Sequence, residues 1–420
     1  MSHIVETSAG QTQQDPSQRK ALPRTVKALG WVSLLTDAAS DMIYPLVPEL
    51  LRSIGGGAVW LGWFEGVAEI VSTSLKLVSG RMSDNPRARK PLIAFGYGIA
   101  ALSRPLFALA ASPLHAVLIR AIDRVGKGLR GPPRDAMVAN AVSAEQRGHA
   151  FGFHRMMDNF GGAIGPMLAF ALLWVAHLPL RTVFALAAIP GLLAVLVVLL
   201  FVRDPSIAPS DSTTASDSVE KPPAVAAISQ EKLRLSGAAG RYLVALFVFS
   251  LAGAGDLFLL RRMSDLGLGA AFVPIAWISL QLGKGLLNVP GGRASDRFGR
   301  KRVLALSWLL YGVTYAGFGM ADSWIVAWIW LGLYAVHYGL AEGGQRAIMA
   351  ELVPAHMRGR AYGIQLALEG AAILVANVAF GYVYDRMGAF VAFTGAGVIA
   401  VFGAALLVLI VPSPRRLVSN

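Results

Sequence analysis

The chain has 420 residues, of which 55% are hydrophobic and only 15% are charged, and its mean hydropathy is positive. This composition excludes a soluble globular protein and indicates a polytopic membrane protein, and the absence of cysteine excludes disulfides, thiolate metal sites and cysteine nucleophiles. A net charge of +13 would suit a nucleic-acid binder, but Lys and Arg gather in short loops between apolar runs, where they orient helices, so we expect no nucleic-acid partner.

Twelve apolar segments predict spanning helices, because a helix needs about 20 mostly apolar residues to cross a bilayer. They cover approximately 27–52, 58–80, 90–111, 113–141, 148–176, 180–203, 240–262, 271–291, 302–321, 324–352, 357–385 and 388–412. Residues 1–26 are polar, without the apolar core of a signal peptide, and we expect them and 413–420 to be cytoplasmic tails. Residues 204–239 have the Ser-, Thr-, Pro- and Asp-rich composition of a flexible cytoplasmic linker. The predicted fold is all-α and integral to the membrane, with six-helix bundles at 27–203 and 240–412.

A short polar loop occurs once in each predicted half. Residues 80–90 follow the second segment, and residues 292–302 follow the eighth, at an offset of 212 residues. The helix starts at Arg147-Gly148 and Arg358-Gly359 recur at an offset of 211. One half is therefore a diverged copy of the other, and the two bundles are expected to be pseudo-symmetric.

The basic loops predict the orientation of the chain. With the N-terminus inside, the loops at 81–90 and 293–302, the linker and the C-terminal tail lie on the cytoplasmic side, with Arg261 and Arg262 as the main exception. We expect a monomeric, multi-pass protein of a bacterial inner membrane with both termini in the cytoplasm.

From about residue 27 to residue 412 the chain resembles the major facilitator superfamily, whose loops carry a Gly-x-x-x-Asp-Arg-x-Gly-Arg-Lys pattern after helices two and eight. The second loop fits with Gly292, Asp296, Arg297, Gly299 and Arg300, whereas the first keeps Gly80, Asp84, Arg89 and Lys90. The resemblance implies a cytoplasmic gate in which Asp84 faces the eleventh helix and Asp296 the fifth. A carboxylate in such a loop can accept hydrogen bonds from the free N–H groups at a facing helix N-terminus.

Ionisable residues within the predicted helices are concentrated in the first half, and such residues are costly in a bilayer and usually functional. Three pairs are four residues apart, which places each pair on one helix face, and three of the seven charged residues of the fourth segment join them as candidates. The candidates for proton coupling or substrate binding are Asp37, Asp41, Glu65, Glu69, Arg120, Asp123, Arg124, His154 and Asp158. We expect a pre-paired network with Asp41, beside Tyr44 and Pro45, as the first candidate for the proton carrier; a purely structural network is the alternative.

Two features resemble the proton-coupled antiporter branch of the family. Arg120 resembles the helix-four arginine associated there with proton coupling, although Asp123-Arg124 stands where those proteins have Gln-Gly. Gly161, Gly165 and Pro166 resemble the antiporter signature of helix five, and small residues at this spacing also serve ordinary close helix packing.

The second half carries fewer polar residues and is expected to shape the substrate pocket. Its candidates are Asp256, Gln281, Lys284, Glu342, Gln365 and Glu369. The sequence has no Walker-type phosphate loop, His-Glu-x-x-His motif or nucleophile elbow, so we expect no enzyme activity, no cofactor and no metal.

These observations favour a secondary transporter that works by alternating access with the bilayer, protons and a small molecule as its partners. Proton-coupled efflux of a small amphipathic compound is the first hypothesis, and proton- or ion-coupled import of a polar metabolite, metal or chelate is the second. A receptor on a transporter scaffold is disfavoured, because buried charges would have no reason to persist in it.

Overall fold

The computed structural model describes residues 21–143, 146–204, 237–353 and 357–412, and within these ranges the regular structure is helical, without strands. The N-terminal half consists of α1 (Arg24–Ile43), η2 (Tyr44–Leu46), α2 (Val47–Ser53), α3 (Ala58–Met82), α4 (Pro86–Ser103), η3 (Arg104–Leu109), α5 (Pro113–Asn140), α6 (Arg147–Phe170), η5 (Ala171–Val175), α7 (Leu180–Leu186) and α8 (Ala188–Phe201). The C-terminal half consists of α9 (Ala238–Ser250), α10 (Asp256–Asp265), η7 (Ala270–Phe272), α11 (Val273–Phe298), α12 (Arg300–Met320), α13 (Trp324–Leu352) and α14 (Arg358–Ile410).

Each of the twelve predicted spans is mainly helical in the structure, and the predicted all-α fold of two related six-helix bundles is confirmed. Seven described stretches are long and apolar enough by themselves to cross a membrane, and the α14 stretch among them contains the last two predicted spans. Gly388, with φ of 86°, interrupts the helical conformation between those two spans. Residues 1–20 and 413–420 and most of the linker lie outside the described residues, so the assignment of these segments as cytoplasmic tails and a flexible linker stays a prediction.

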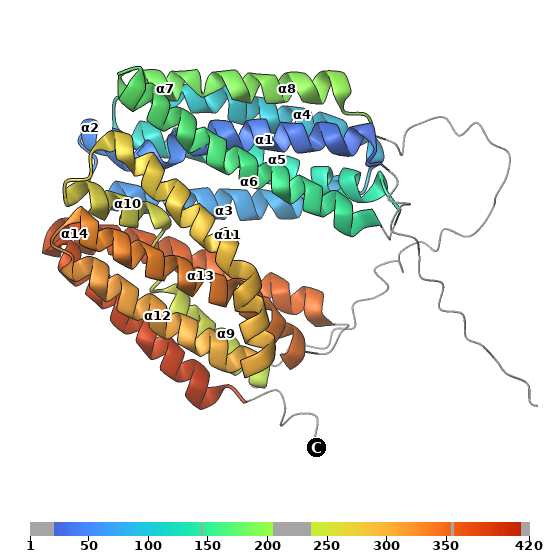
Figure 1. The fold of residues 1–420 in the computed structure, drawn as a ribbon. Coiled ribbons are helices and arrows are strands. Elements are labelled where there is room, and N and C mark those ends of the chain that lie inside the picture. The colour runs from blue at the N-terminus through green and yellow to red at the C-terminus, as the bar shows by residue number, and fades with distance from the viewer. Residues whose placement is uncertain (1–20, 144–145, 205–236, 354–356, 413–420) are drawn as a thin grey trace, which may run out of the picture.

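Helices pack closely within each half, and fewer pairs connect the halves. In the N-terminal half α1 lies against α6 and α8, and α4 lies against α5; in the C-terminal half α12 lies against α13 and α14. Between the halves, α3 runs along α14 and α6 contacts α11. Figure 1 shows the two sets of helices diverging toward the end of the molecule where α8 finishes and α9 begins. We call this the linker end and the other the opposite end.

The first helix of each half is broken, and the two breaks lie at neighbouring, though not identical, positions of the sequence repeat. The helix of α1 gives way at Tyr44 to a 3-10 turn that contains Pro45, whose ring lacks an N–H donor. In the other half, residues 251–255 separate α9 from α10. Tyr44 and Asp256 are 212 residues apart, which is the offset of the loop repeat.

Tyrosines of α12 satisfy the backbone groups that the second break exposes. The Tyr311 hydroxyl donates to the Ala252 carbonyl at 2.8 Å and accepts from the Ala254 N–H at 3.3 Å, and the Tyr315 hydroxyl donates to the Ala254 carbonyl at 2.8 Å. An unpaired backbone group in the bilayer interior costs several kcal/mol. Breaks within membrane-spanning helices are typical of positions where transport proteins hold ligands.

The glycine pair of α6 brings that helix against α1. A side chain at Gly161 would meet the Leu34 carbonyl oxygen, and one at Gly165 would meet the Ala38 carbonyl oxygen. Small residues four apart allow two helix backbones to approach in this way. Gly161 and Gly165 are therefore packing residues between α1 and α6, and Pro166 is buried beside them.

Candidate functional site

Three arginines and two carboxylates of the N-terminal half meet between α3, η3 and α5, and we call them the arginine cluster. Its members are Glu65, Arg104, Arg120, Asp123 and Arg124. Asp123 accepts from the Arg104 Nε at 3.2 Å and pairs with the Arg124 guanidinium at 2.7 Å and with that of Arg120 at 3.9 Å. Arg120 also donates to Glu65 at 3.3 Å. Asp123 and all three arginines are buried.

Helical spacing in α5 produces this arrangement. Asp123 and Arg124 follow Arg120 by three and four residues, which places all three side chains on a common helix face. Arg104 starts η3 on the neighbouring helix and is fixed by a hydrogen bond of 2.9 Å to the Thr36 carbonyl of α1. The predicted pre-paired network is formed at Arg120, Asp123 and Arg124, with Arg104 joining through tertiary packing. The prediction was wrong for Asp37 and Asp41, which have no ion pair or hydrogen bond among the described residues, because no described cation or donor of a neighbouring helix comes within bonding distance of them.

Tyr44, at the break in the first helix, connects the arginine cluster with the C-terminal half. Its hydroxyl donates to Glu65 at 2.9 Å, and the Arg120 guanidinium lies over its ring, 5.0 Å from the ring centroid. The same ring contacts Trp277 of α11 in the C-terminal half, with 4.9 Å between the ring centroids. Glu65 lies beside Gly255, at the second helix break. The two broken helices therefore meet at one place in the middle of the molecule.

The C-terminal half contributes a second ion pair next to this point. The Lys284 ammonium donates to Asp256 at 2.5 Å, and the Tyr334 hydroxyl donates to the other carboxylate oxygen at 2.7 Å. The same ammonium lies 4.1 Å from the ring centroid of Tyr338, a cation–π contact. Asp256 and Lys284, predicted only as cavity candidates, are thus direct partners, and Asp256 acts electrostatically on Tyr44.

A third group of ionisable residues lies between α1, α5 and α6. Asp158 accepts a hydrogen bond from the Ser33 hydroxyl and lies 3.4 Å from the His154 imidazole. Asp37 and Asp41 are half-buried, and neither has a hydrogen bond or ion pair among the described residues. Lys127 of α5 acts electrostatically on both without forming an ion pair.

Other predicted candidates lie away from these contacts. Glu69 is exposed and accepts from the Thr73 hydroxyl at 2.9 Å on its own helix, and Gln281 is also exposed. Gln365 donates to Glu369 at 3.1 Å along α14. The side chain of Glu342 lies outside the described residues. Among the residues that the structure describes, no group of three or more potential ligands could hold a metal ion.

The residues predicted to form a gate at the linker end make contacts within their own halves. Arg89 donates to the Ser83 carbonyl at 2.8 Å, Lys90 to the Leu199 carbonyl at 3.2 Å, and Arg300 to Glu351 at 2.5 Å. Arg297 lies over Phe298, 5.3 Å from the ring centroid.

The two gate aspartates themselves face solvent. Asp84 is exposed, and the Asp296 side chain is 75% exposed, with only an ion pair of 3.9 Å to Arg300 of its own half. Gly80 and Gly292 have open space around them, and Gly299 adopts φ of 93°, which favours glycine. In this conformation neither aspartate has a described partner in the other half.

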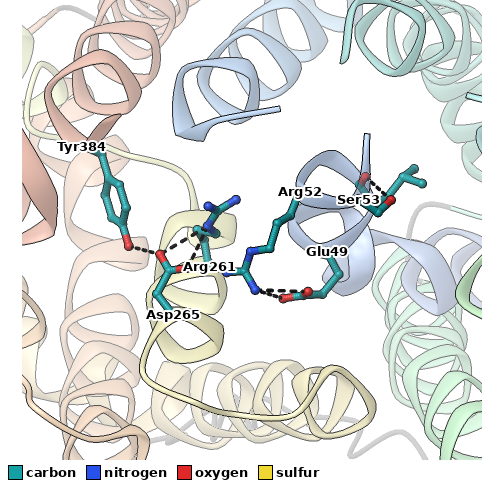
Figure 2. Close-up of polar contacts among 7 residues, drawn as sticks. Glu49, Arg52, Ser53, Arg261, Asp265 and Tyr384 are labelled. Atoms are coloured by element: carbon teal, nitrogen blue, oxygen red, sulfur yellow. Dashed lines mark hydrogen bonds and ion pairs between the residues drawn. The ribbon is translucent and has the colours of Figure 1, made fainter. Parts of the chain in front are cut away.

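The halves are instead joined at the opposite end by residues that sequence reasoning missed. Asp385 of α14 accepts from the backbone N–H groups of Ala58 at 2.7 Å and Val59 at 2.8 Å, the first residues of α3. Nearby, Asp265 binds Arg52 of the N-terminal half and is also bound by Arg261 at 3.1 Å and the Tyr384 hydroxyl at 2.5 Å (Figure 2). We call these contacts the outer latch.

A pair of aromatic side chains forms a second contact between the two halves at the opposite end. Trp174, at the end of the α6 span, packs on Phe272 before α11, with 4.8 Å between ring centroids. Asp385 lies 211 residues after Trp174, which is also the offset between the repeated helix starts at Arg147-Gly148 and Arg358-Gly359. The repeat therefore places a carboxylate contact on one side of the molecule and an aromatic contact at the related position on the other.

Comparisons with known proteins agree with this architecture. Over 404 residues the chain is 28% identical to an uncharacterized MFS-type transporter of Methanocaldococcus jannaschii, which covers 95% of this chain and 98% of that protein. It is 30% identical over 179 residues to the multidrug resistance protein MdtH of Proteus mirabilis, covering 40% of this chain and 44% of that protein.

Among solved structures, a D-xylose–proton symporter superposes with a TM-score of 0.70 and 17% identity, covering 93% of this chain and 98% of the other. The sequence profile of the Major Facilitator Superfamily matches residues 29–280 and 257–420, which together span nearly the whole chain. The chain is therefore a multi-pass membrane protein that belongs to the Major Facilitator Superfamily of transporters.

Proposed function

We propose that this transporter works by alternating access and couples transport to protons through Asp37 and Asp41. The observation that carries the proposal is their lack of partners. Glu65, Asp123 and Asp256 are held by cations or hydroxyl donors. Asp37 and Asp41 have neither an ion pair nor a hydrogen bond among the described residues.

A coupling carboxylate must change its proton affinity between the two states of the carrier. That affinity depends on access to water and on nearby charge. Asp41 acts electrostatically with Lys127, Arg104 and Arg124 of neighbouring helices, so a small movement of α1 changes the charge that it experiences. The close packing of α1 on α6 through Gly161 and Gly165 makes these two helices one rigid unit in that movement.

We propose that the structure corresponds to the state open toward the linker end. The outer latch is formed, and the described residues of the predicted gate contact only their own halves. The basic loops lie at the linker end, which supports the proposal that this end is cytoplasmic, in a bacterial inner membrane.

Efflux is the proposed direction, supported by the similarity of part of the chain to MdtH, a multidrug resistance protein. Proton-coupled import is the second candidate, and the arginine cluster favours it. Three buried guanidinium groups at the centre of the molecule would repel a cationic compound, whereas they can bind a polar or anionic substrate.

The Asp41→Asn variant tests proton coupling. In proteoliposomes the variant should still exchange substrate across the membrane but should not move it against a gradient when a pH difference is imposed. Wild-type protein and Glu69→Gln, which removes an exposed carboxylate of α3, serve as controls. Full pH-driven accumulation by Asp41→Asn and by Asp37→Asn would show that both carboxylates are structural.

A further inference from the structure

We propose that the place where the two broken helices meet binds the anionic group of the substrate, a carboxylate or a phosphate-class group, between Arg120 and Trp277. The inference rests on the proposed transport function and assigns its substrate class. It follows from the charge balance of the arginine cluster, from two unpaired hydrogen-bond donors, and from their common neighbour Tyr44.

The charge balance is the first argument. Three guanidinium groups, from Arg104, Arg120 and Arg124, share the two carboxylates of Glu65 and Asp123, so the cluster carries one positive charge in excess. The Lys284–Asp256 pair next to it is neutral. Asp41 acts electrostatically on Arg104 and Arg124, but it forms an ion pair with neither. A buried charge without a paired counter-charge is unfavourable, and an anionic ligand removes that penalty.

Unpaired donors are the second argument. The Nε of Arg120 and the Nε1 of Trp277 are buried and have no hydrogen-bond partner in the described part of the chain. The two residues are 6% and 5% exposed, so bulk water does not readily supply an acceptor. Both groups are donors only, and neither can be satisfied by another donor. A ligand that satisfies them must therefore bring acceptor atoms.

The position of these donors is the third argument. Arg120 belongs to the N-terminal half and Trp277 to the C-terminal half, yet both lie about the ring of Tyr44, at 5.0 Å and 4.9 Å. An anionic group beside Tyr44 supplies acceptors to both and so bridges the halves. The half-buried ring of Tyr44, which packs on Trp277, offers aromatic surface for the rest of the molecule. The affinity for an anion at this point therefore depends on the relative position of the two halves, and a transported substrate must bind the two conformations of its carrier differently.

The test uses four probes of one shape: benzoate, phenylphosphonate, benzamide and benzylamine. Binding to the full-length protein in nanodiscs is measured by isothermal titration. We expect saturable binding of the two anions, at least tenfold weaker binding of neutral benzamide, and no detectable binding of cationic benzylamine. The ratio of the two anion affinities distinguishes a carboxylate site from a phosphate-class site.

Two variants locate the site. Trp277→Phe keeps the aromatic ring and removes the Nε1 donor, and Arg120→Lys keeps the charge and removes the Nε donor. Each should weaken anion binding about tenfold, the effect of losing one hydrogen bond to a charged group. The matched controls are Trp63→Phe and Arg241→Lys, whose native side chains are exposed, and they should bind as the wild type does.

The proposal is overturned if neither anion binds saturably, if benzamide or benzylamine binds as tightly as benzoate, or if Trp277→Phe and Arg120→Lys both bind anions normally. These outcomes are distinct from failure of the proposed coupling. Loss of pH-driven transport in Asp41→Asn together with absent anion binding would leave proton coupling in place and reject the anion site alone.

Discussion

The Asp385→Ala substitution should open the opposite end of the transporter. Asp385 accepts two hydrogen bonds from the N-terminus of α3, at 2.7 and 2.8 Å. Removing a helix N-cap acceptor costs about 0.5–2 kcal/mol, and removing a negative charge from the positive end of a helix costs about 0.3–1 kcal/mol more. The sum, about 1–3 kcal/mol, corresponds to a shift of about 5- to 150-fold in the ratio of the two states.

The ion pair in the same latch should matter less, although it joins two full charges. The Arg52 and Asp265 side chains are 38% and 23% exposed, and exposed pairs of this kind contribute about 0.2–1 kcal/mol. Arg52→Ala should therefore shift the equilibrium less than Asp385→Ala does. Asp385→Asn, which keeps an acceptor and loses the charge, should fall between Asp385→Ala and the wild type.

The absence of cysteine makes the measurement direct, since two introduced cysteines are the only labelling sites. Ala111 and Gly269 are exposed at the opposite end, one in each half. Spin labels at these positions should show a longer-distance population by pulsed EPR in Asp385→Ala. Asp322→Ala removes an exposed carboxylate at the same end and serves as the control. An unchanged distance distribution in Asp385→Ala, or a larger change in Arg52→Ala, would refute the reasoning.

Three further predictions concern the gate, the linker and the α1–α6 contact. Asp296→Asn should increase the population of the conformation seen here without affecting membrane insertion, because in this conformation Asp296 has no partner in the other half among the described residues. Thiol-reactive labels that do not reach cysteines introduced at the linker end of the variant would contradict this prediction. Shortening the segment 206–230, which lies outside the described residues, should leave transport unchanged because its composition cannot form a core, and lost transport at normal expression would reveal a docking role. Gly165→Val should reduce the yield of folded protein severalfold on size-exclusion chromatography, because its side chain would meet the α1 backbone, whereas Gly98→Ala, which faces open space, should not.

Local sequence properties were sufficient to predict the fold. Hydrophobic length identified all twelve spans, since the bilayer sets a minimum length for a helix that crosses it. The spacing of four residues placed Arg120 and Arg124 on one face of α5, and the structure shows both on Asp123. The repeat at 80–90 and 292–302 predicted two related halves, because related segments fold alike, whereas the boundary between them, placed in the linker from its composition, stays a prediction.

The partners across helices were not predictable in the same way. Asp256 was an isolated candidate in the sequence, and Lys284 finds it only because α11 packs beside α10. Glu69 lies four residues after Glu65 on α3, yet Glu69 is exposed, whereas Glu65 lies beside Gly255 of the other half.

The sequence alone determined which segments enter the membrane and which residues carry charge into it, because these depend on local hydrophobicity and helical period. Among the described residues, the tertiary structure decided which charges are paired, that Asp37 and Asp41 have no partner, and which residues join the two halves at the opposite end. The outer latch illustrates the reason. Asp385 and Ala58 are separated by 327 positions, and their hydrogen bond depends on how two whole bundles are tilted against each other, which is not a property of either segment.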